Sequence, residues 1–130
     1  MIRLLLDTHI WLWMVTAPDR LSAAARRLVV PMDNELILSA VSPWEVAIKY
    51  ATGKLRFSAP IQTLIPEWMA QAGVIPLPIN HRHATQVASL PLHHADPFDR
   101  LLIAQAQVEQ LTVLTTDPDF DRYDVKVSRA

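Results

Sequence analysis

Cysteine is absent from this chain of 130 residues, and glycine occurs only twice. Without a thiol there can be no disulfide framework, no cysteine-ligated zinc or iron–sulfur site and no cysteine nucleophile. A chain that uses no cysteine fits a reducing compartment, so we expect a cytoplasmic protein. Because glycine is so scarce, the ends of helices and strands have to be inferred from proline, capping residues and hydrophobic periodicity.

An excess of positive charge is missing as well. The chain has 12 Lys and Arg against 13 Asp and Glu, and its formal net charge is −1. Its overall field cannot hold nucleic acid, so any phosphate binding has to be local. The apolar N-terminal stretch, residues 1–15, is interrupted by Asp7 and His9 and is too short to cross a bilayer. We therefore expect neither membrane insertion nor export.

A hydrophobic share of 51% is enough to build a core, and we expect residues 1–130 to form a single domain. Short apolar runs alternate with longer helical patterns along the chain. The runs expected to be strands are residues 2–6, 36–39, 74–79, 112–115 and 125–127. The patterns expected to be helices are residues 8–15, 21–28, 42–52, 61–72, 81–90 and 96–108. This alternation predicts an α/β fold with a mostly parallel sheet of four to five strands, covered by helices on both faces.

Four acidic residues are expected at one edge of that sheet. Asp7 and Asp117 each follow a predicted strand within two residues, and ligands of open parallel sheets bind where the strands end. Glu45 and Asp99 lie in the first turns of two predicted helices, which begin along the same edge. Gathered carboxylates repel one another unless a hard cation neutralises them, which predicts Mg²⁺ as the cofactor, with Mn²⁺ as an alternative. Such an ion can activate water for phosphodiester hydrolysis.

Three of these acids also have an ordinary structural interpretation. Ser42 followed three residues later by Glu45 is a capping box, which satisfies helix N–H groups without any metal. Asp7 can cap the helix that follows it, and Asp117 belongs to an acidic turn of the kind usually found in solvated loops. The loop histidines His93 and His94 are expected to be solvated, and we do not assign them to the site.

Four segments resemble the motif blocks of VapC-type PIN-domain toxins, and they occur in the same order along nearly the whole chain. The segments are Leu4–His9, Ser39–Lys49, Asp96–Ala106 and Leu114–Asp117. The resemblance implies a PIN-like three-layer α/β/α sandwich and a Mg²⁺-dependent endoribonuclease. It also implies RNA as the substrate, a small cognate antitoxin as inhibitor, and a homodimer.

The resemblance places the acidic quartet of the family at Asp7, Glu45, Asp99 and Asp117. Thr115 stands where relatives commonly have Ser or Thr beside the site. Two other functions stay open from the residues alone. One is a PIN-like module that binds a partner without cleaving RNA. The other is an aspartyl-phosphate receiver or phosphatase, which is disfavoured because no lysine lies at a predicted strand end.

Overall fold

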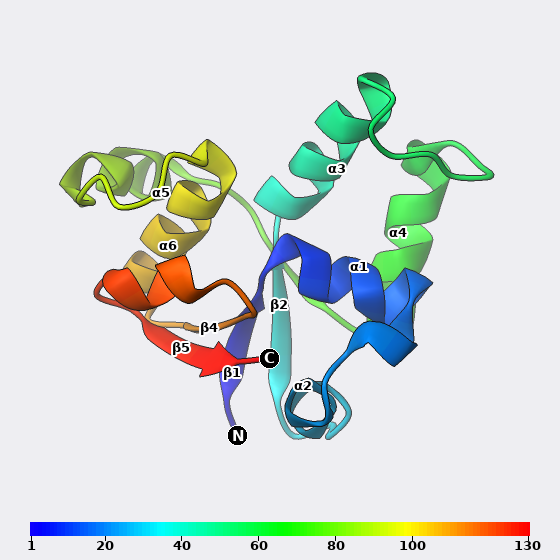
Figure 1. Cartoon of the computed structure of the whole chain (residues 1–130), viewed down its shortest axis with the longest axis horizontal. Helices are drawn as coiled ribbons and strands as arrows, with labels where there is room; N and C mark the ends of the chain where they lie inside the picture. The colour runs from blue at the N-terminus through cyan, green and yellow to red at the C-terminus, as the bar shows by residue number, and fades with distance from the viewer.

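The computed structural model describes residues 1–130, and its centre is a five-stranded sheet (Figure 1). The strands are β1 (Arg3–Leu6), β2 (Glu35–Ser39), β3 (Ile75–Leu77), β4 (Thr112–Thr115) and β5 (Lys126–Arg129). They lie in the order β3-β2-β1-β4-β5, and every neighbouring pair is parallel. The predicted α/β fold and parallel sheet are thus confirmed, although the fifth strand begins and ends slightly later than expected.

Helices cover both faces of the sheet. They are α1 (Thr8–Thr16), α2 (Ala23–Val29), α3 (Val41–Ala51), α4 (Ile61–Ala72), α5 (His81–Gln86) and α6 (Pro97–Glu109), with short 3-10 helices at Pro18–Arg20, Val87–Ser89 and Pro118–Arg122. Figure 1 shows α5 and α6 on one side of the strands and α1, α2 and α4 on the other. No helix is both long enough and apolar enough to cross a membrane.

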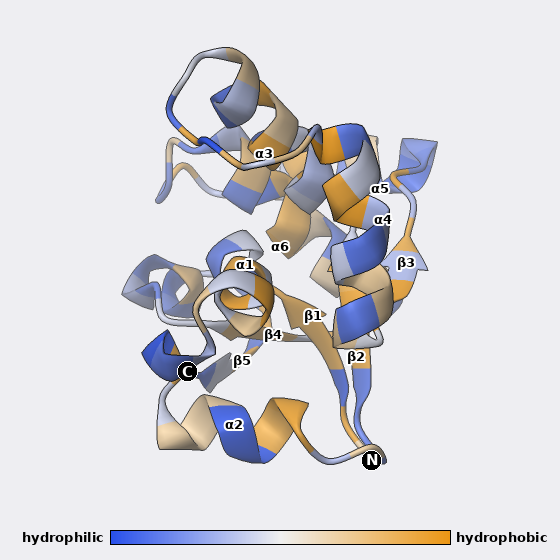
Figure 2. Ribbon diagram, turned by 90° about the vertical axis from the view of Figure 1, so that its right-hand side faces the viewer, coloured by the Kyte–Doolittle hydropathy of each residue, from blue (hydrophilic) through white to orange (hydrophobic).

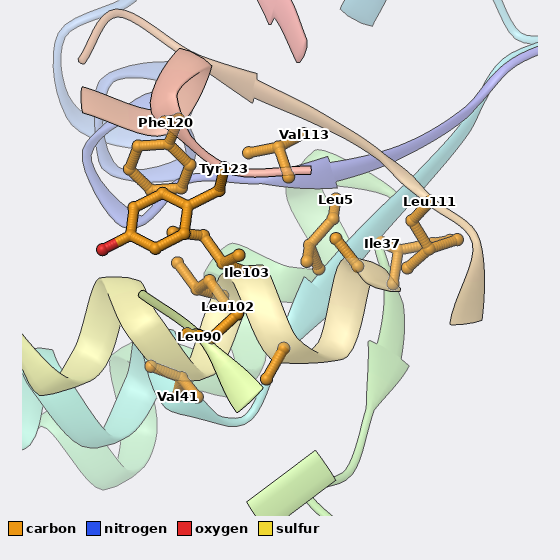
Figure 3. Packing of buried hydrophobic residues seen from close by; sticks show 12 residues of the cluster. Leu5, Ile37, Val41, Leu90, Leu102, Ile103, Leu111, Val113, Phe120 and Tyr123 are labelled. Atoms are coloured by element: carbon orange, nitrogen blue, oxygen red, sulfur yellow. The ribbon is translucent and has the colours of Figure 1, made fainter. Parts of the chain in front are cut away.

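Alternation along β1 divides the hydrophobic core into two parts. Leu5 packs into one buried cluster with residues of α6, and that cluster includes Phe120 (Figure 3). Leu4 and Leu6 point to the opposite face and pack in a second cluster with α1 and α4. In Figure 2 the central strands are coloured mainly as hydrophobic, whereas α2 and α4 carry hydrophilic stretches on their outer sides. Both faces of the sheet are therefore buried, as a parallel sheet requires.

The start of α3 differs from the sequence prediction. The helix begins at Val41 rather than after Ser42, and the Val41 N–H donates to Ser39 Oγ at 3.0 Å. Ser42 Oγ is instead 2.9 Å from Thr8 Oγ1, in a buried contact between α3 and α1. The predicted capping box of Ser42 and Glu45 is wrong, because the serine hydroxyl is engaged with another helix.

The strand order reverses between β1 and β4. From β1 the chain moves outward to β2 and β3, and it then crosses to β4 and β5 on the other side of β1. The Asp7 N–H donates to the carbonyl of Leu114 at 3.0 Å, so the ends of β1 and β4 lie directly against each other. A reversal of this kind opens a crevice at the carboxyl ends of the strands, where α/β proteins bind their ligands.

Candidate active site

Asp7 comes directly after β1 and is only 3% exposed. Its Oδ1 accepts the N–H of Thr8 at 2.8 Å, and its Oδ2 accepts the hydroxyl of Thr115 at 2.6 Å. Thr115 ends β4 and is fully buried. The ends of β1 and β4 therefore fix the Asp7 carboxylate between them. Thr115, which the resemblance placed beside the site, is the residue that holds it.

Glu45 lies in α3 and is 7% exposed. Its Oε2 forms an ion pair of 2.7 Å with Lys49, one turn further along the helix. Its Oε1 is buried and has no hydrogen-bond partner. A buried carboxylate oxygen without a partner is costly, which makes it the strongest local indication that this side chain serves a ligand.

The two acids at the start of α6 have different surroundings. Asp96 Oδ1 accepts the N–H of Phe98 at 2.8 Å and that of Asp99 at 3.3 Å, so Asp96 caps the helix. Asp99 lies in the first turn of the helix, and its side chain does not take part in the cap. Its carboxylate is 15% exposed and faces the same cavity as Asp7.

Asp117 follows β4 and begins a short 3-10 helix. Its Oδ1 accepts the N–H of Asp119 at 2.9 Å, and its own N–H donates to Thr115 Oγ1 at 3.0 Å. The Thr115 hydroxyl thus links Asp7 and Asp117 by donating to one and accepting from the other. This pair of hydrogen bonds sets the spacing of the two acids across the ends of β1 and β4.

All these carboxylates line one cavity of about 280 Å³. Its lining includes Asp7, Glu45, Lys49, Asp96, Asp99 and Asp117. The structure therefore brings together the four acids that the sequence expected at this edge. Their assignment as metal ligands, and that of Thr115 to the catalytic group, stay predictions.

The crowding of negative charge changes the proton affinity of two acids. Burial, together with the carboxylates of Asp7 and Asp96, raises the pKa of Asp99 from 3.8 to about 8. Burial also raises the pKa of Asp7, although His9 and the hydrogen bond from Thr115 oppose this change. Lys49 is a positively charged neighbour of these acids, and its hydrogen bond to Glu45 raises the pKa of its ammonium group. Asp7 and Asp99 therefore bind their protons more tightly than free carboxyl groups do.

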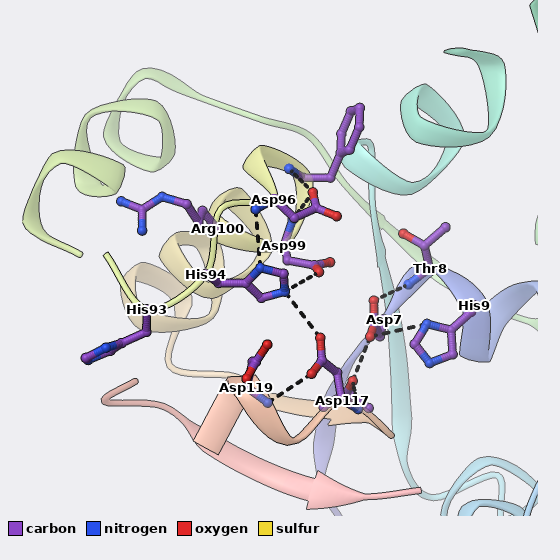
Figure 4. A network of polar contacts seen from close by, with 12 residues as sticks. Asp7, Thr8, His9, His93, His94, Asp96, Asp99, Arg100, Asp117 and Asp119 are labelled. Carbon is purple, nitrogen blue, oxygen red and sulfur yellow. Dashed lines mark hydrogen bonds and ion pairs between the residues drawn. The ribbon is translucent and has the colours of Figure 1, made fainter. Parts of the chain in front are cut away.

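His94 is the functional candidate that the sequence interpretation missed. We expected it to be solvated, but its imidazole lies among the acids (Figure 4). Nε2 is 2.9 Å from Asp99 Oδ2 and 3.2 Å from Asp117 Oδ2. Burial lowers the pKa of His94, but these two carboxylates outweigh it and raise the pKa above its usual value. Its position two residues before the helix cap Asp96 is the one signal that could have suggested it.

Neighbouring basic residues point elsewhere. His93 is exposed, and its ring packs edge-on against Tyr123 at 5.3 Å. The guanidinium of Arg100 donates to the backbone carbonyl of Pro91 at 2.9 Å and supports the loop that precedes α6. Figure 4 shows both side chains directed away from the acids. His9, by contrast, lines the cavity with Nδ1 3.4 Å from Asp7 Oδ2.

The residues of the cavity fit a hard divalent cation. The available donors are carboxylate oxygens, which Mg²⁺ and Mn²⁺ prefer, and no thiolate competes with them. Glu45 Oε1 has a free, buried lone pair, and the raised pKa of Asp99 shows that His94 does not offset the burial of that carboxyl and the negative charge around it. The cavity therefore has both the donor atoms and the unneutralised charge that such an ion requires.

The arrangement of this cavity, at the reversal point of a five-stranded parallel sheet, agrees with a known family. The sequence profile of the PIN domain matches residues 4–126. The chain belongs to the PIN domain family, which confirms the resemblance of the four motif segments.

Individual relatives belong to the VapC group. The chain is 30% identical to Ribonuclease VapC22 of Mycobacterium tuberculosis over 120 residues, which cover 90% of this chain and 88% of that protein. It is 40% identical to Ribonuclease VapC16 of the same organism over 58 residues, or 45% of this chain and 41% of that protein. VapBC2 from Rickettsia felis, solved bound to a DNA fragment from its promoter, has the same fold, with a TM-score of 0.73, 14% identity and 98% of each chain covered.

Proposed function

We propose that the protein is a metal-dependent endoribonuclease, the toxin of a toxin–antitoxin pair, and that Mg²⁺, or Mn²⁺ in its place, is its cofactor. The observation that carries this proposal is the convergence of four carboxylates in one cavity, with Glu45 Oε1 buried and unpaired. The protein's membership of the PIN domain family and its similarity to two proteins named ribonucleases support RNA as the substrate.

The four acids and Thr115 have distinct parts in this proposal. Asp7, Asp99 and Asp117 would hold the ion and Glu45 would complete the site. Bound there, a divalent cation supplies Lewis-acid activation of water and charge neutralisation at the scissile phosphate. Thr115 keeps the Asp7 carboxylate in place through its hydrogen bond of 2.6 Å.

Two kinds of protein contact belong to this proposal. We propose a small cognate antitoxin as the inhibitor, in line with the VapBC structures that share this fold.

We also propose a homodimer. Trp44 and Ile48 of α3 are 50% and 38% exposed, and apolar side chains of this size in solvent suit a protein interface.

The test is cleavage of labelled RNA by the purified protein in Mg²⁺, in Mn²⁺ and in chelator. Cleavage is expected with either metal and not with chelator, and Asp7→Asn should abolish it. Asp33→Asn is the matched control, because Asp33 is exposed and lies outside the cavity. Cleavage that survives both chelator and Asp7→Asn would overturn the proposal. A phosphodonor reaction that adds a stable phosphate to Asp7 would favour receiver chemistry instead.

A further inference from the structure

Several contacts of its ring and backbone hold His94 in place. Its Nε2 faces Asp99 and Asp117, and its Nδ1 accepts the N–H of Asp96 at 3.2 Å. Its backbone N–H donates to the hydroxyl of Tyr123 at 2.8 Å, and the ring stands edge-on to Phe120 at 6.4 Å. With a side chain only 16% exposed, His94 is held firmly against two acids of the cavity, Asp99 and Asp117.

These contacts decide which nitrogen carries the proton. Because Nδ1 accepts an amide N–H, the hydrogen-bond network assigns the ring proton to Nε2. Nε2 then donates toward Oδ2 of Asp99 and Oδ2 of Asp117, at 2.9 and 3.2 Å. A nitrogen that carries a proton cannot ligate a metal. His94 is therefore a donor to the acids, although it lies close enough to Asp117 and Asp119 to look like a ligand.

The acids consequently fall into two sets that share Asp99. Asp7 and Glu45 both act on the Asp99 carboxylate electrostatically, and Glu45 keeps a free oxygen. Asp117 is joined to Asp99 through the His94 imidazole (Figure 4). Hydrolases that use two metal ions hold them about 4 Å apart between carboxylates of this kind. Here the chain's own N–H donor already occupies the space between Asp99 and Asp117.

We propose that the Nε2–H group of His94 occupies the space that a second cation would need, so that the cavity binds one divalent ion per chain. In this arrangement His94 is a positioning residue, which holds the Asp99 and Asp117 carboxylates together against their mutual repulsion. The inference rests on the proposed function, because it concerns the same site, and it specifies the metal stoichiometry of that site.

The test is the number of Mn²⁺ ions bound per chain without RNA, measured by equilibrium dialysis with electron paramagnetic resonance of free Mn²⁺. The wild-type protein is expected to bind one ion. His94→Ala removes the donor and opens its space, so the stoichiometry should rise to two. His94→Gln places an amide N–H near the position of Nε2 and should restore one. His93→Ala is the matched control and should also bind one, since His93 points away from the acids.

Each contrary result has a clear meaning. Two ions on the wild-type protein, or one ion on a folded His94→Ala variant, would overturn the role of His94. Circular dichroism and thermal melts in chelator establish whether that variant is folded, and the wild-type stoichiometry tests the inference even if it is not. No Mn²⁺ binding by the wild-type protein would overturn the metal site of the proposed function as well, whereas two ions would leave that function intact.

Discussion

The Asp99 carboxyl binds its proton more tightly in the folded protein than in the unfolded chain, because its pKa is raised from 3.8 to about 8. Ionising this group therefore costs folding free energy, and the metal-free protein loses stability as the pH rises from about 4 to about 8. Below that window both states are protonated and the cost disappears. Asp99, which the proposed activity requires, thus destabilises the metal-free protein.

Asp99→Asn should raise the stability of the metal-free protein. An amide stays neutral, so near pH 8 the variant is expected to gain roughly 2 kcal/mol or more, about 5–10 °C in melting temperature for a chain of this size. Near pH 4 the gain should vanish, and RNA cleavage should be lost at any pH. Thermal melts in chelator measure the change, with Asp33→Asn as the control. A variant that melts below the wild type near pH 8 would contradict the carboxylate cluster.

Thr115→Val should damage the protein although the two side chains have nearly the same shape. The buried hydroxyl of Thr115 donates to Asp7 and accepts the N–H of Asp117, and valine removes both hydrogen bonds. We expect a loss of about 1–3 kcal/mol in urea unfolding and a strong loss of RNA cleavage. Thr115→Ser keeps the hydroxyl and should retain most of both. Equal stability of the valine and wild-type proteins would rule out this role.

Serine and aspartate residues near helix starts have different roles in this protein. Ser22 lies before α2, and its hydroxyl accepts the N–H of Ala25 at 3.0 Å. Ser42 lies inside α3, and its hydroxyl contacts Thr8 instead. Asp96 caps α6 and so leaves Asp99 free to face the cavity. Caps thus stabilise helices and also decide which acids are available for chemistry.

Ser22→Ala should lower the free energy of unfolding by about 1 kcal/mol, because it removes the cap of α2. Ser22→Asp supplies another capping oxygen and should preserve stability. Neither change touches the cavity, so RNA cleavage well below the melting temperature should equal that of the wild type. Urea unfolding beside the cleavage assay provides the comparison. Loss of cleavage in a folded Ser22→Ala variant would mean that α2 contributes to the site.

The cavity exists only in the complete fold, because its acids come from positions 7, 45, 99 and 117 of the chain. An ion that binds the folded protein alone stabilises the whole molecule by mass action. We therefore expect Mn²⁺ to raise the melting temperature of the wild-type protein. The rise should be larger near pH 8 than near pH 6, because binding has to displace the proton of Asp99. A shift that does not depend on pH would argue against Asp99 as a ligand.

Much of the site was predictable because it depends on where elements end. Asp7 and Asp117 follow short apolar runs, and parallel strands bring such ends to one edge whatever the details of packing. His94 was not predictable in the same way. Its loop has no periodicity, and its place between two acids depends on contacts with Tyr123 and Phe120 from a distant segment.

The sequence by itself determined the alternation of strands and helices, the parallel sheet and the four acids at its edge, because hydrophobic periodicity and local capping act over short distances. Tertiary structure decided the rest. It made Ser42 a contact of Thr8 rather than a cap, left Glu45 Oε1 buried without a partner and placed His94 between Asp99 and Asp117. Each of these outcomes depends on atoms far apart in the chain, whose distance is fixed only when the two cores pack against the sheet.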